Sequence, residues 1–554
     1  MSPDLPEMSA LQGRYPARSV ALWHRGSALL ALALLGCDGT VDALSRIDPP
    51  ALLHSTMAST AYGVAQRKWS HFPVPPEDGP LLAPTALMVA VQESPVPTSP
   101  RIGYLRLGEK VARSEQPVST TGCPGGWYAI RPVGFVCQDK NSTVKMDHPL
   151  VRAFGHGPDR SKPLPYSYGF LRAVAPNYLK VPTEDEQFKS EMRLDRHLRN
   201  HKRFTESWDA MNPGANDVPL SESGAAKGPV PPETESPDMH ARYGGSGDDT
   251  VPWWLDGERR VPNISTFRAP SYAVIAGRIK RHAGLALVDS FVAGEESMKR
   301  RFAVSVDGRL VPTDKIKADG GSTFHGEELG KHSLPVAFPW RQGAKSWKAV
   351  GNGLEKAESV PLRAMIPLTG KVRSVSGVRY VEAKDGEWLR SQDLKVAPAP
   401  SELPWFAKDG VRWIDIGILS QTLVLYEGRT PVYATLISSG RDGLGDPQKT
   451  LSTPTGTFRI YQKHVTTTMD SDAADNEFEL RDVPWVMYFK GGYALHAAYW
   501  HDDFGRLRSH GCINLSPIDA RYVFNWTTPD TPVSWHGSYA GDAFGKGTLI
   551  HIHA

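Results

Sequence analysis

One cysteine near the C-terminal end of the chain lies in a setting that favours thiol chemistry. Cys512 is part of the stretch RSHGCINLS at residues 508–516, where His510 precedes it by two positions and Gly511 stands between them. A thiol attacks a carbonyl as its thiolate, so it needs a base close by, and histidine commonly serves. His496, sixteen residues upstream, is a second candidate base. The residue types predict a cysteine nucleophile with a histidine partner.

The two histidines differ in how they could reach the sulfur. Alternate residues of an extended segment share a face but lie about 6–7 Å apart, which places His510 poorly as a base. His496 ends an apolar, strand-like run, and a hairpin loop could bring it beside Cys512. Gly511 lets the backbone turn tightly, and the N–H groups around it could face a developing oxyanion. We favour His496 as the base and keep His510 as a catalytic candidate.

The N-terminal sequence resembles a signal peptide for export, and this resemblance suggests a role for Cys37. Arginines precede an apolar run at residues 27–37 that is too short to span a bilayer but suits a signal peptide. Residues 34–37, Leu-Leu-Gly-Cys, resemble the lipobox of bacterial lipoproteins, although Leu35 replaces the usual small residue. We expect export to the periplasm and membrane attachment through lipidated Cys37. Cleavage without lipidation, an uncleaved anchor and a buried N-terminal helix are the alternatives.

Export favours a disulfide between the next two cysteines. Cys123 and Cys137 lie 14 positions apart in a hairpin-like stretch with glycine-rich turns. Closing so short a loop contributes about 3 kcal/mol in the chain-entropy model. Cys512 is then left without a mate, and an unpaired cysteine in an oxidising compartment has to be buried or used.

Composition indicates a multidomain, mainly β protein. Lysine and arginine total 63 against 60 acidic residues, which argues against a nucleic-acid binder. The 51 glycines and 46 prolines favour a loop-rich β protein, and we expect no cofactor. The expected segments are a signal peptide (1–37), a Pro-rich tether (38–100), a β-rich module with the disulfide and a helix (101–204), a linker (205–252), small β modules (253–400) and a C-terminal domain (408–554).

Residues 253–400 contain a weak internal repeat. Asp307-Gly308 and Asp385-Gly386 each follow a strand-like run and are each followed, at the same spacing, by an apolar residue and a lysine. Small barrels resembling bacterial SH3-like domains would fit this pattern. Chance similarity of two turns fits it as well.

The C-terminal domain shows sharper strand patterns and one clear helix start. Ser516 supplies an N-cap, Pro517 the first helical position and Asp519 an acid in the first turn. The helix should run to Trp526, just beyond Cys512. Strands are expected at 411–418, 422–426, 432–437, 456–463, 485–489, 493–498 and 548–553.

Residues 408–554 resemble the L,D-transpeptidase catalytic domain, the YkuD type, which implies a β-sandwich. The resemblance rests on Trp413-Ile-Asp-Ile, on Thr453-Pro-Thr-Gly-Thr-Phe, and on His496 followed by Ser-His-Gly-Cys-Ile-Asn at 509–514. It implies that Cys512 is the nucleophile and His496 the general base and acid. The family commonly has a small or hydroxyl residue after this histidine, and Ala497 offers no hydroxyl. The remaining implied roles are loop shaping by Ser509 and His510, and positioning of substrate or oxyanion by Gly511 and Asn514.

Aromatic residues close to this histidine in sequence are candidates for a substrate cleft. We expect Tyr499 and Trp500 to line a cleft for the stem peptide, and Trp485 to lie in the core.

The resemblance implies acyl transfer on bacterial peptidoglycan. Cys512 would attack the carbonyl of the third stem-peptide residue, a diamino acid, release the terminal D-alanine and leave a thioester. A neighbouring stem's amine would then give a 3→3 cross-link, water would give a carboxypeptidase, and a protein amine would attach that protein to the wall. Carbapenems would be expected to acylate Cys512.

Two other classes of protein compete with this interpretation. A zinc hydrolase could use His551, His553 and His501, but no His-Glu-x-x-His pair appears and Cys512 would have no role, so we expect no metal site. A wall-binding lipoprotein with a degenerate C-terminal domain is the second alternative. The intact pair of His496 and Cys512 argues against it.

Overall fold

The computed structural model describes most of the chain beyond the N-terminal region. The described residues are 72–155, 157–211, 243–244, 250–257, 260–264, 268–471 and 478–554. The predicted signal peptide, Cys37 and most of the tether lie outside this range. The described chain is mainly β, as predicted, and none of its helices combines the length and apolar character needed to cross a membrane.

The N-terminal module begins inside the segment predicted as a tether. Leu81–Pro84 and Met88–Gln92 form β1 and β2, so the tether prediction is wrong for these residues. Their apolar runs bury Leu82 and Val91 between the flanking prolines and turns. The module's other elements are β3 (Arg101–Arg106), β4 (Val111–Ala112), β5 (Trp127–Ala129), β6 (Phe135–Cys137), β7 (Ser142–Thr143) and α2 (Pro149–Ala153).

The disulfide closes the hairpin of this module. Cys123 and Cys137 are bonded, with their Cα atoms 5.9 Å apart. Strand β5 pairs with β6, so the bridge fastens the end of a ladder that is already hydrogen-bonded.

A second module uses residues from both sides of the predicted linker. Strand β9 pairs with β10 and strand β8 with β11. The boundary predicted at residue 204 is therefore displaced, because β8 and β9 complete the sheet of the downstream segment. The elements are β8 (Ser167–Leu171), β9 (Ala175–Tyr178), α3 (Glu184–Ser190), α4 (Leu194–Met211), β10 (Ile275–Ile279), β11 (Gly284–Val292), η3 (Glu295–Ser297), β12 (Arg301–Ser305), β13 (Leu310–Pro312), η4 (Thr313–Lys315) and β14 (Ile316–Ala318).

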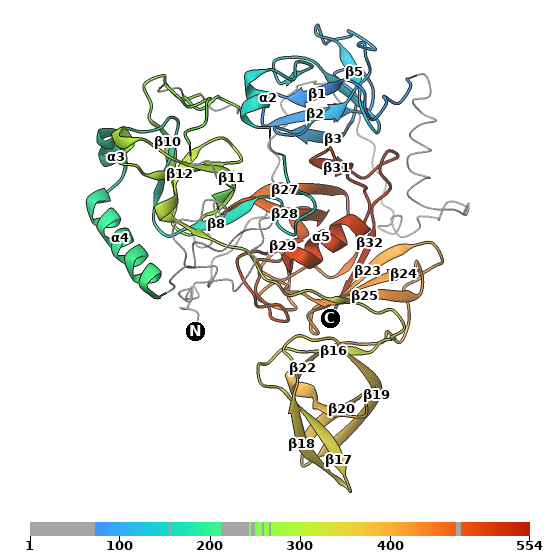
Figure 1. Cartoon of the computed structure of the whole chain (residues 1–554). Coiled ribbons are helices and arrows are strands. Elements are labelled where there is room, and N and C mark those ends of the chain that lie inside the picture. Colours follow the sequence, from blue (N-terminus) through green and yellow to red (C-terminus); the bar gives the residue numbers. More distant parts are fainter. Residues whose placement is uncertain are drawn as a thin grey trace, which may run out of the picture.

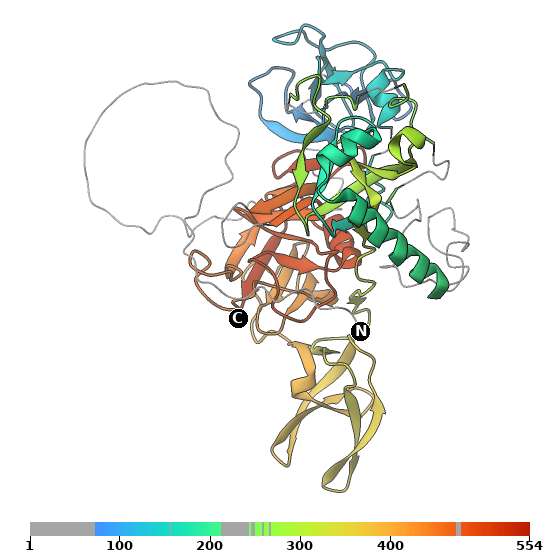
Figure 2. The same ribbon diagram turned by 90° about the vertical axis from the view of Figure 1, so that its left-hand side faces the viewer.

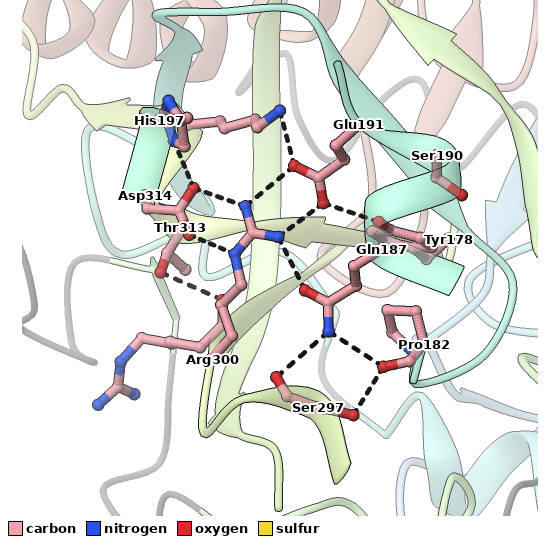
Figure 3. A network of polar contacts seen from close by, with 12 residues as sticks. Tyr178, Pro182, Gln187, Ser190, Glu191, His197, Ser297, Arg300, Thr313 and Asp314 are labelled. Carbon is pink, nitrogen blue, oxygen red and sulfur yellow. Dashed lines mark hydrogen bonds and ion pairs between the residues drawn. The ribbon is translucent and has the colours of Figure 1, made fainter. Parts of the chain in front are cut away.

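A buried charge network fastens helices α3 and α4 to this sheet (Figure 3). Arg300 donates to both carboxylate oxygens of Glu191 at 2.6 and 3.0 Å and to Asp314 at 2.5 and 2.8 Å. Lys315 adds an ion pair with Glu191 at 2.7 Å, and His197 of α4 lies 2.8 Å from Asp314. These five residues are called the Arg300 network below.

A third unit, the inserted module of residues 336–397, projects away from the other parts of the molecule (Figures 1 and 2). Its seven strands form one sheet in the order β18-β17-β21-β20-β19-β16-β22. The elements are β16 (Val336–Pro339), β17 (Lys345–Val350), β18 (Gly353–Ser359), β19 (Ile366–Val375), β20 (Val378–Ala383), β21 (Trp388–Arg390), η5 (Ser391–Asp393) and β22 (Leu394–Ala397).

The weak internal repeat in the sequence corresponds to a repeated order of secondary-structure elements. Asp307-Gly308 connects β12 to β13, which leads through η4 into β14. Asp385-Gly386 connects β20 to β21, which leads through η5 into β22. The two turns thus occupy equivalent places in the second and inserted modules, and a relation to SH3-like domains stays a prediction.

The C-terminal domain places two sheets on either side of a common core. One sheet has the order β15-β25-β24-β23-β32-β26, and the other contains β27 to β30. Helix α5 and apolar side chains of both sheets fill the space between them, including Trp485, which is fully buried as predicted. The elements are β15 (Glu327–Glu328), β23 (Arg412–Gly417), β24 (Thr422–Glu427), β25 (Thr430–Leu436), β26 (Gly456–Arg459), β27 (Gln462–Ser471), β28 (Phe478–Lys490), β29 (Tyr493–Ala497), β30 (Ile513–Leu515), α5 (Pro517–Trp526), β31 (Gly537–Tyr539) and β32 (Leu549–His553).

Strand pairing joins the C-terminal domain to both upstream modules. Strand β31 pairs with β27 on one side and with β3 on the other. Strand β28 continues beyond the domain core and pairs in parallel with β11, where Leu480 lies opposite Gly284. A single hydrogen-bonded sheet therefore crosses three units, as the central strands in Figure 1 show.

Candidate active site

The reactive residues lie along two adjacent parallel strands. In the register of β29 and β30, Leu495 is opposite Ile513 and His496 is opposite Asn514. Cys512 immediately precedes β30, so it continues this register opposite Ala494, and these two side chains pack in one cluster. Because side chains alternate between the faces of a sheet, Cys512, His496 and Asn514 share one face. The opposite face is buried in the domain core through Leu495, Ala497, Ile513 and Leu515.

A backbone contact selects the tautomer of His496. The ring is buried, and Nδ1 lies 3.1 Å from the carbonyl oxygen of Ala497. A carbonyl can only accept, so Nδ1 carries the hydrogen and Nε2 keeps its lone pair. Burial lowers the pKa of His496 to about 4, which leaves the imidazole neutral at neutral pH. The missing hydroxyl of Ala497 is thus immaterial, because its backbone supplies the contact.

Cys512 is the free thiol of the described chain. It is half-buried, and burial raises its pKa to about 11, although a backbone hydrogen bond from Ala494 works in the opposite direction. Its Sγ lies 3.8 Å from the carbonyl oxygen of Gly492. At neutral pH Cys512 is therefore a thiol and His496 a neutral imidazole, so an attack by Cys512 would require a base to remove the thiol proton.

Ser509 and Gly511 set the shape of the loop before the nucleophile. The Ser509 hydroxyl donates to the carbonyl oxygen of Cys512 at 2.5 Å and accepts from the N–H of Gly511 at 3.1 Å. Gly511 has φ +114°, and a Cβ there would lie 2.6 Å from a ring carbon of Tyr493. A larger residue would both strain the backbone and collide with this ring. The Ser-x-Gly-Cys spacing therefore follows from the turn that presents the sulfur.

Asn514 is held by a histidine whose role the sequence did not reveal. Its side-chain amide lies 3.0 Å from Nε2 of His501, while Nδ1 of His501 accepts from the N–H of Asp503 at 3.2 Å. The sequence suggested His501 only as a zinc ligand. Its position on the loop that follows His496 was the feature of the sequence that could have indicated a role near the site. The contact fixes the amide that lies opposite His496 in the register.

His510 and His496 occupy different environments. His510 is exposed, and its ring packs against Phe478 of β28 at a centroid distance of 5.2 Å. His496 is buried, oriented by a hydrogen bond and on the face that carries Cys512. Of the two candidate bases, His496 alone is buried on the face that carries Cys512, and the ring of His510 contacts Phe478 instead.

The prediction that Tyr499 lines an open cleft is wrong. Tyr499 is 1% exposed and packs against Tyr168 at 4.5 Å and Phe170 at 5.3 Å, both from the second module. It belongs to the apolar contact between the two units. Trp500 is half-buried and lies between Tyr499 and His496, with its ring 5.7 Å from the His496 ring.

The histidines of the zinc alternative are dispersed. His553 pairs with Asp415 at 3.1 Å and His551 lies 3.2 Å from Thr457, on the far strand β32, while His501 contacts Asn514. Within the described ranges, groups of three or more His, Cys, Asp or Glu side chains suited to hold a metal ion are absent.

Comparisons with known proteins agree on the C-terminal domain. Residues 411–534 match the YkuD family, described as the L,D-transpeptidase catalytic domain. YciB of Bacillus subtilis (strain 168), whose name assigns it to the L,D-transpeptidases, is 26% identical over 179 residues, which cover 28% of this chain and 76% of YciB.

Solved structures similar to the chain carry the same name. An L,D-transpeptidase of Xylanimonas cellulosilytica (residues 123–326) is 21% identical with a TM-score of 0.18; the match covers 28% of this chain and 64% of that one, less than two thirds of its length. The catalytic domain of the E. faecium L,D-transpeptidase is 21% identical with a TM-score of 0.20, covering 26% of this chain and 98% of that domain. Together with the family match, the site described above leads to one identification: residues 411–534 are a YkuD-type L,D-transpeptidase catalytic domain.

Proposed function

We propose that the chain is a peptidoglycan L,D-transpeptidase that forms 3→3 cross-links through a thioester on Cys512. The observation that carries this proposal is the common face of β29 and β30, which carries the Cys512 thiol, the His496 imidazole with its hydrogen on Nδ1 and the fixed amide of Asn514. A nucleophile, a base and a polar positioning group are the parts that acyl transfer needs.

Acylation begins from the neutral pair. As Sγ of Cys512 attacks the carbonyl of the third stem-peptide residue, Nε2 of His496 takes the thiol proton. The N–H group of Cys512 would stabilise the oxyanion, because the N–H of Gly511 already donates to Ser509. The tetrahedral intermediate then breaks its bond to the terminal D-alanine, whose amine leaves with the proton from His496. A thioester remains on Cys512.

The second half of the reaction repeats these steps with an amine. The side-chain amine of a neighbouring stem attacks the thioester carbonyl while His496 accepts its proton, and Cys512 leaves as the thiolate and recovers that proton. Water in place of the amine would yield a tripeptide stem, and a protein amine would yield a wall-attached protein. A peptidoglycan substrate would require a location in the cell envelope, and we propose periplasmic export with a lipid anchor at Cys37.

Product analysis tests the proposal. The purified protein is incubated with disaccharide-tetrapeptide muropeptides, and the products are resolved by chromatography and mass spectrometry, with Cys512→Ala as the control. We expect released D-alanine and 3→3 dimers from the native protein alone. Tripeptides without dimers would identify a carboxypeptidase. Unchanged substrate with folded protein would overturn the proposal in favour of a degenerate wall-binding lipoprotein.

A further inference from the structure

Three cations surround one tryptophan where the inserted module meets the loop that leads to Cys512. The ring of Trp340 lies 4.9 Å from the guanidinium of Arg341, 5.2 Å from the amine of Lys395 and 5.3 Å from the guanidinium of Arg506. Two of these cations belong to the inserted module, whereas Arg506 stands six residues before Cys512. These four residues are called the basic–aromatic junction.

An ion pair fixes the two sides of the junction relative to each other. Both guanidinium nitrogens of Arg363, in the inserted module, donate to the carboxylate of Asp502 at 2.6 Å each. The Arg363 side chain is 13% exposed and also lies over the ring of Phe324 at 5.1 Å. Bidentate pairs of this kind restrict orientation as well as distance. The loop after His496 and the inserted module therefore act as one surface.

The junction carries more positive charge than its neighbours neutralise. Asp393 pairs with Arg341 at 3.7 Å, but within the described residues neither Lys395 nor Arg506 forms an ion pair. An aromatic face attracts a cation without cancelling its charge, so the cations still repel one another. Burial first, and the charge of Arg506 second, lower the pKa of Lys395. A bound anion would relieve this repulsion.

We propose that the basic–aromatic junction binds the carboxylates of the second, acceptor stem peptide. The inference rests on the proposed function and extends it to the acceptor. A peptidoglycan stem carries free carboxylates along the same chain as its reactive amine, and an arginine fork matches a carboxylate in geometry. The indole offers an apolar surface to the stem's alkyl groups. Arg506 lies on the loop of the nucleophile, so a stem held there is directed toward the thioester.

Binding to the full chain carrying Cys512→Ala tests this inference without turnover. The probe is a disaccharide-tripeptide muropeptide, titrated by calorimetry at low salt. Arg506→Glu and, independently, Lys395→Glu should each weaken binding at least about tenfold, and Arg506→Lys should restore most of the affinity. Arg379→Glu is the matched control, since Arg379 is an exposed cation elsewhere on the inserted module. Circular dichroism and thermal melting verify that each variant is folded.

Three results would overturn the inference: unchanged affinity in Arg506→Glu, equal weakening in Arg506→Glu and Arg379→Glu, or binding of inorganic phosphate with no measurable muropeptide binding. The last result would mark an anion site unrelated to the stem. Failure of the proposed function would be seen separately, as native protein that binds the muropeptide through the junction yet forms no 3→3 dimers.

Discussion

Two clusters of buried ionisable groups in this protein differ in whether opposite charges offset the effect of burial. In the Arg300 network, burial opposes ionisation of Glu191, but Arg300 and Lys315 outweigh it and hold the pKa of that carboxyl below its usual value. At the active site, burial raises the pKa of Cys512 and lowers the pKa of His496 with no opposite charge to compensate. Glu191 is therefore ionised beside its cations at neutral pH, whereas Cys512 and His496 are neutral.

The difference separates a structural role from a catalytic one. Fully paired charges cannot give up a proton without leaving a partner uncompensated in the interior, so the Arg300 network is fixed. In the proposed mechanism, the neutral thiol of Cys512 gives one proton to the neutral imidazole of His496 as the sulfur attacks a substrate carbonyl. Burial alone therefore does not identify an active site, because the charge balance of the cluster decides what it can do.

Removing the base should produce the largest effect. His496→Gln should slow acylation of Cys512 by meropenem about 10²- to 10⁴-fold, because the thiol proton loses its acceptor. Intact-protein mass spectrometry at timed intervals measures the rate. His553→Gln, on β32 and paired with Asp415, is the control and should acylate at the native rate. An equal rate in both variants would show that His496 is not the base.

Breaking the charged cluster should affect stability and leave the chemistry intact. Arg300→Met removes the arginine shared by Glu191 and Asp314 and leaves Lys315 and His197 beside these buried carboxylates. It should lower the free energy of unfolding of the second module by about 3–5 kcal/mol. Lys299→Met removes an exposed ion pair with Glu295 and should cost less than about 1 kcal/mol. Urea unfolding followed by hydrogen exchange of α3 measures both. A smaller loss for Arg300→Met than for Lys299→Met would contradict the contrast between the clusters.

The pH dependence of thiol reactivity should distinguish a neutral pair from a preformed ion pair. Because burial raises the pKa of Cys512 to about 11, the thiolate fraction is small at neutral pH and grows as pH rises. Alkylation by iodoacetamide should therefore accelerate steadily from pH 7 to beyond pH 9. A thiolate–imidazolium pair would instead give a rate that is already at its plateau below pH 8.

The smallest effect is expected at the neighbouring histidine. His510→Ala should change the meropenem acylation rate by less than about tenfold, because the exposed ring contacts Phe478 and the proton acceptor remains. A loss equal to that of His496→Gln would transfer the role of base to His510.

What could be predicted from the sequence was local or carried by a motif. The helix after Cys512 follows from an N-cap and a proline, and the structure shows Ser516 accepting from the N–H of Asp519 at the start of α5. The disulfide follows from two cysteines on one hairpin. The pair of Cys512 and His496 was identified by spacing and resemblance, and the strand register then placed both on one face.

What could not be predicted depends on contacts between distant residues. The partners of Arg300 include Glu191, 109 positions away, and no local pattern connects them. Tyr499 was placed in a cleft because its covering rings come from strand β8, more than three hundred residues upstream. Strands β1 and β2 were not predicted, because the surrounding prolines made the segment resemble a tether. Local composition did not indicate which distant strands would pair with them.

The most direct test of the central claim is the covalent capture of Cys512. The native protein and its Cys512→Ala variant are incubated with meropenem at neutral pH and weighed by intact-protein mass spectrometry. We predict one adduct at Cys512 in the native protein that the variant lacks, since Cys512 is the free thiol of the described residues. A folded native protein that stays unmodified, or an adduct that persists in Cys512→Ala, would contradict Cys512 as the nucleophile.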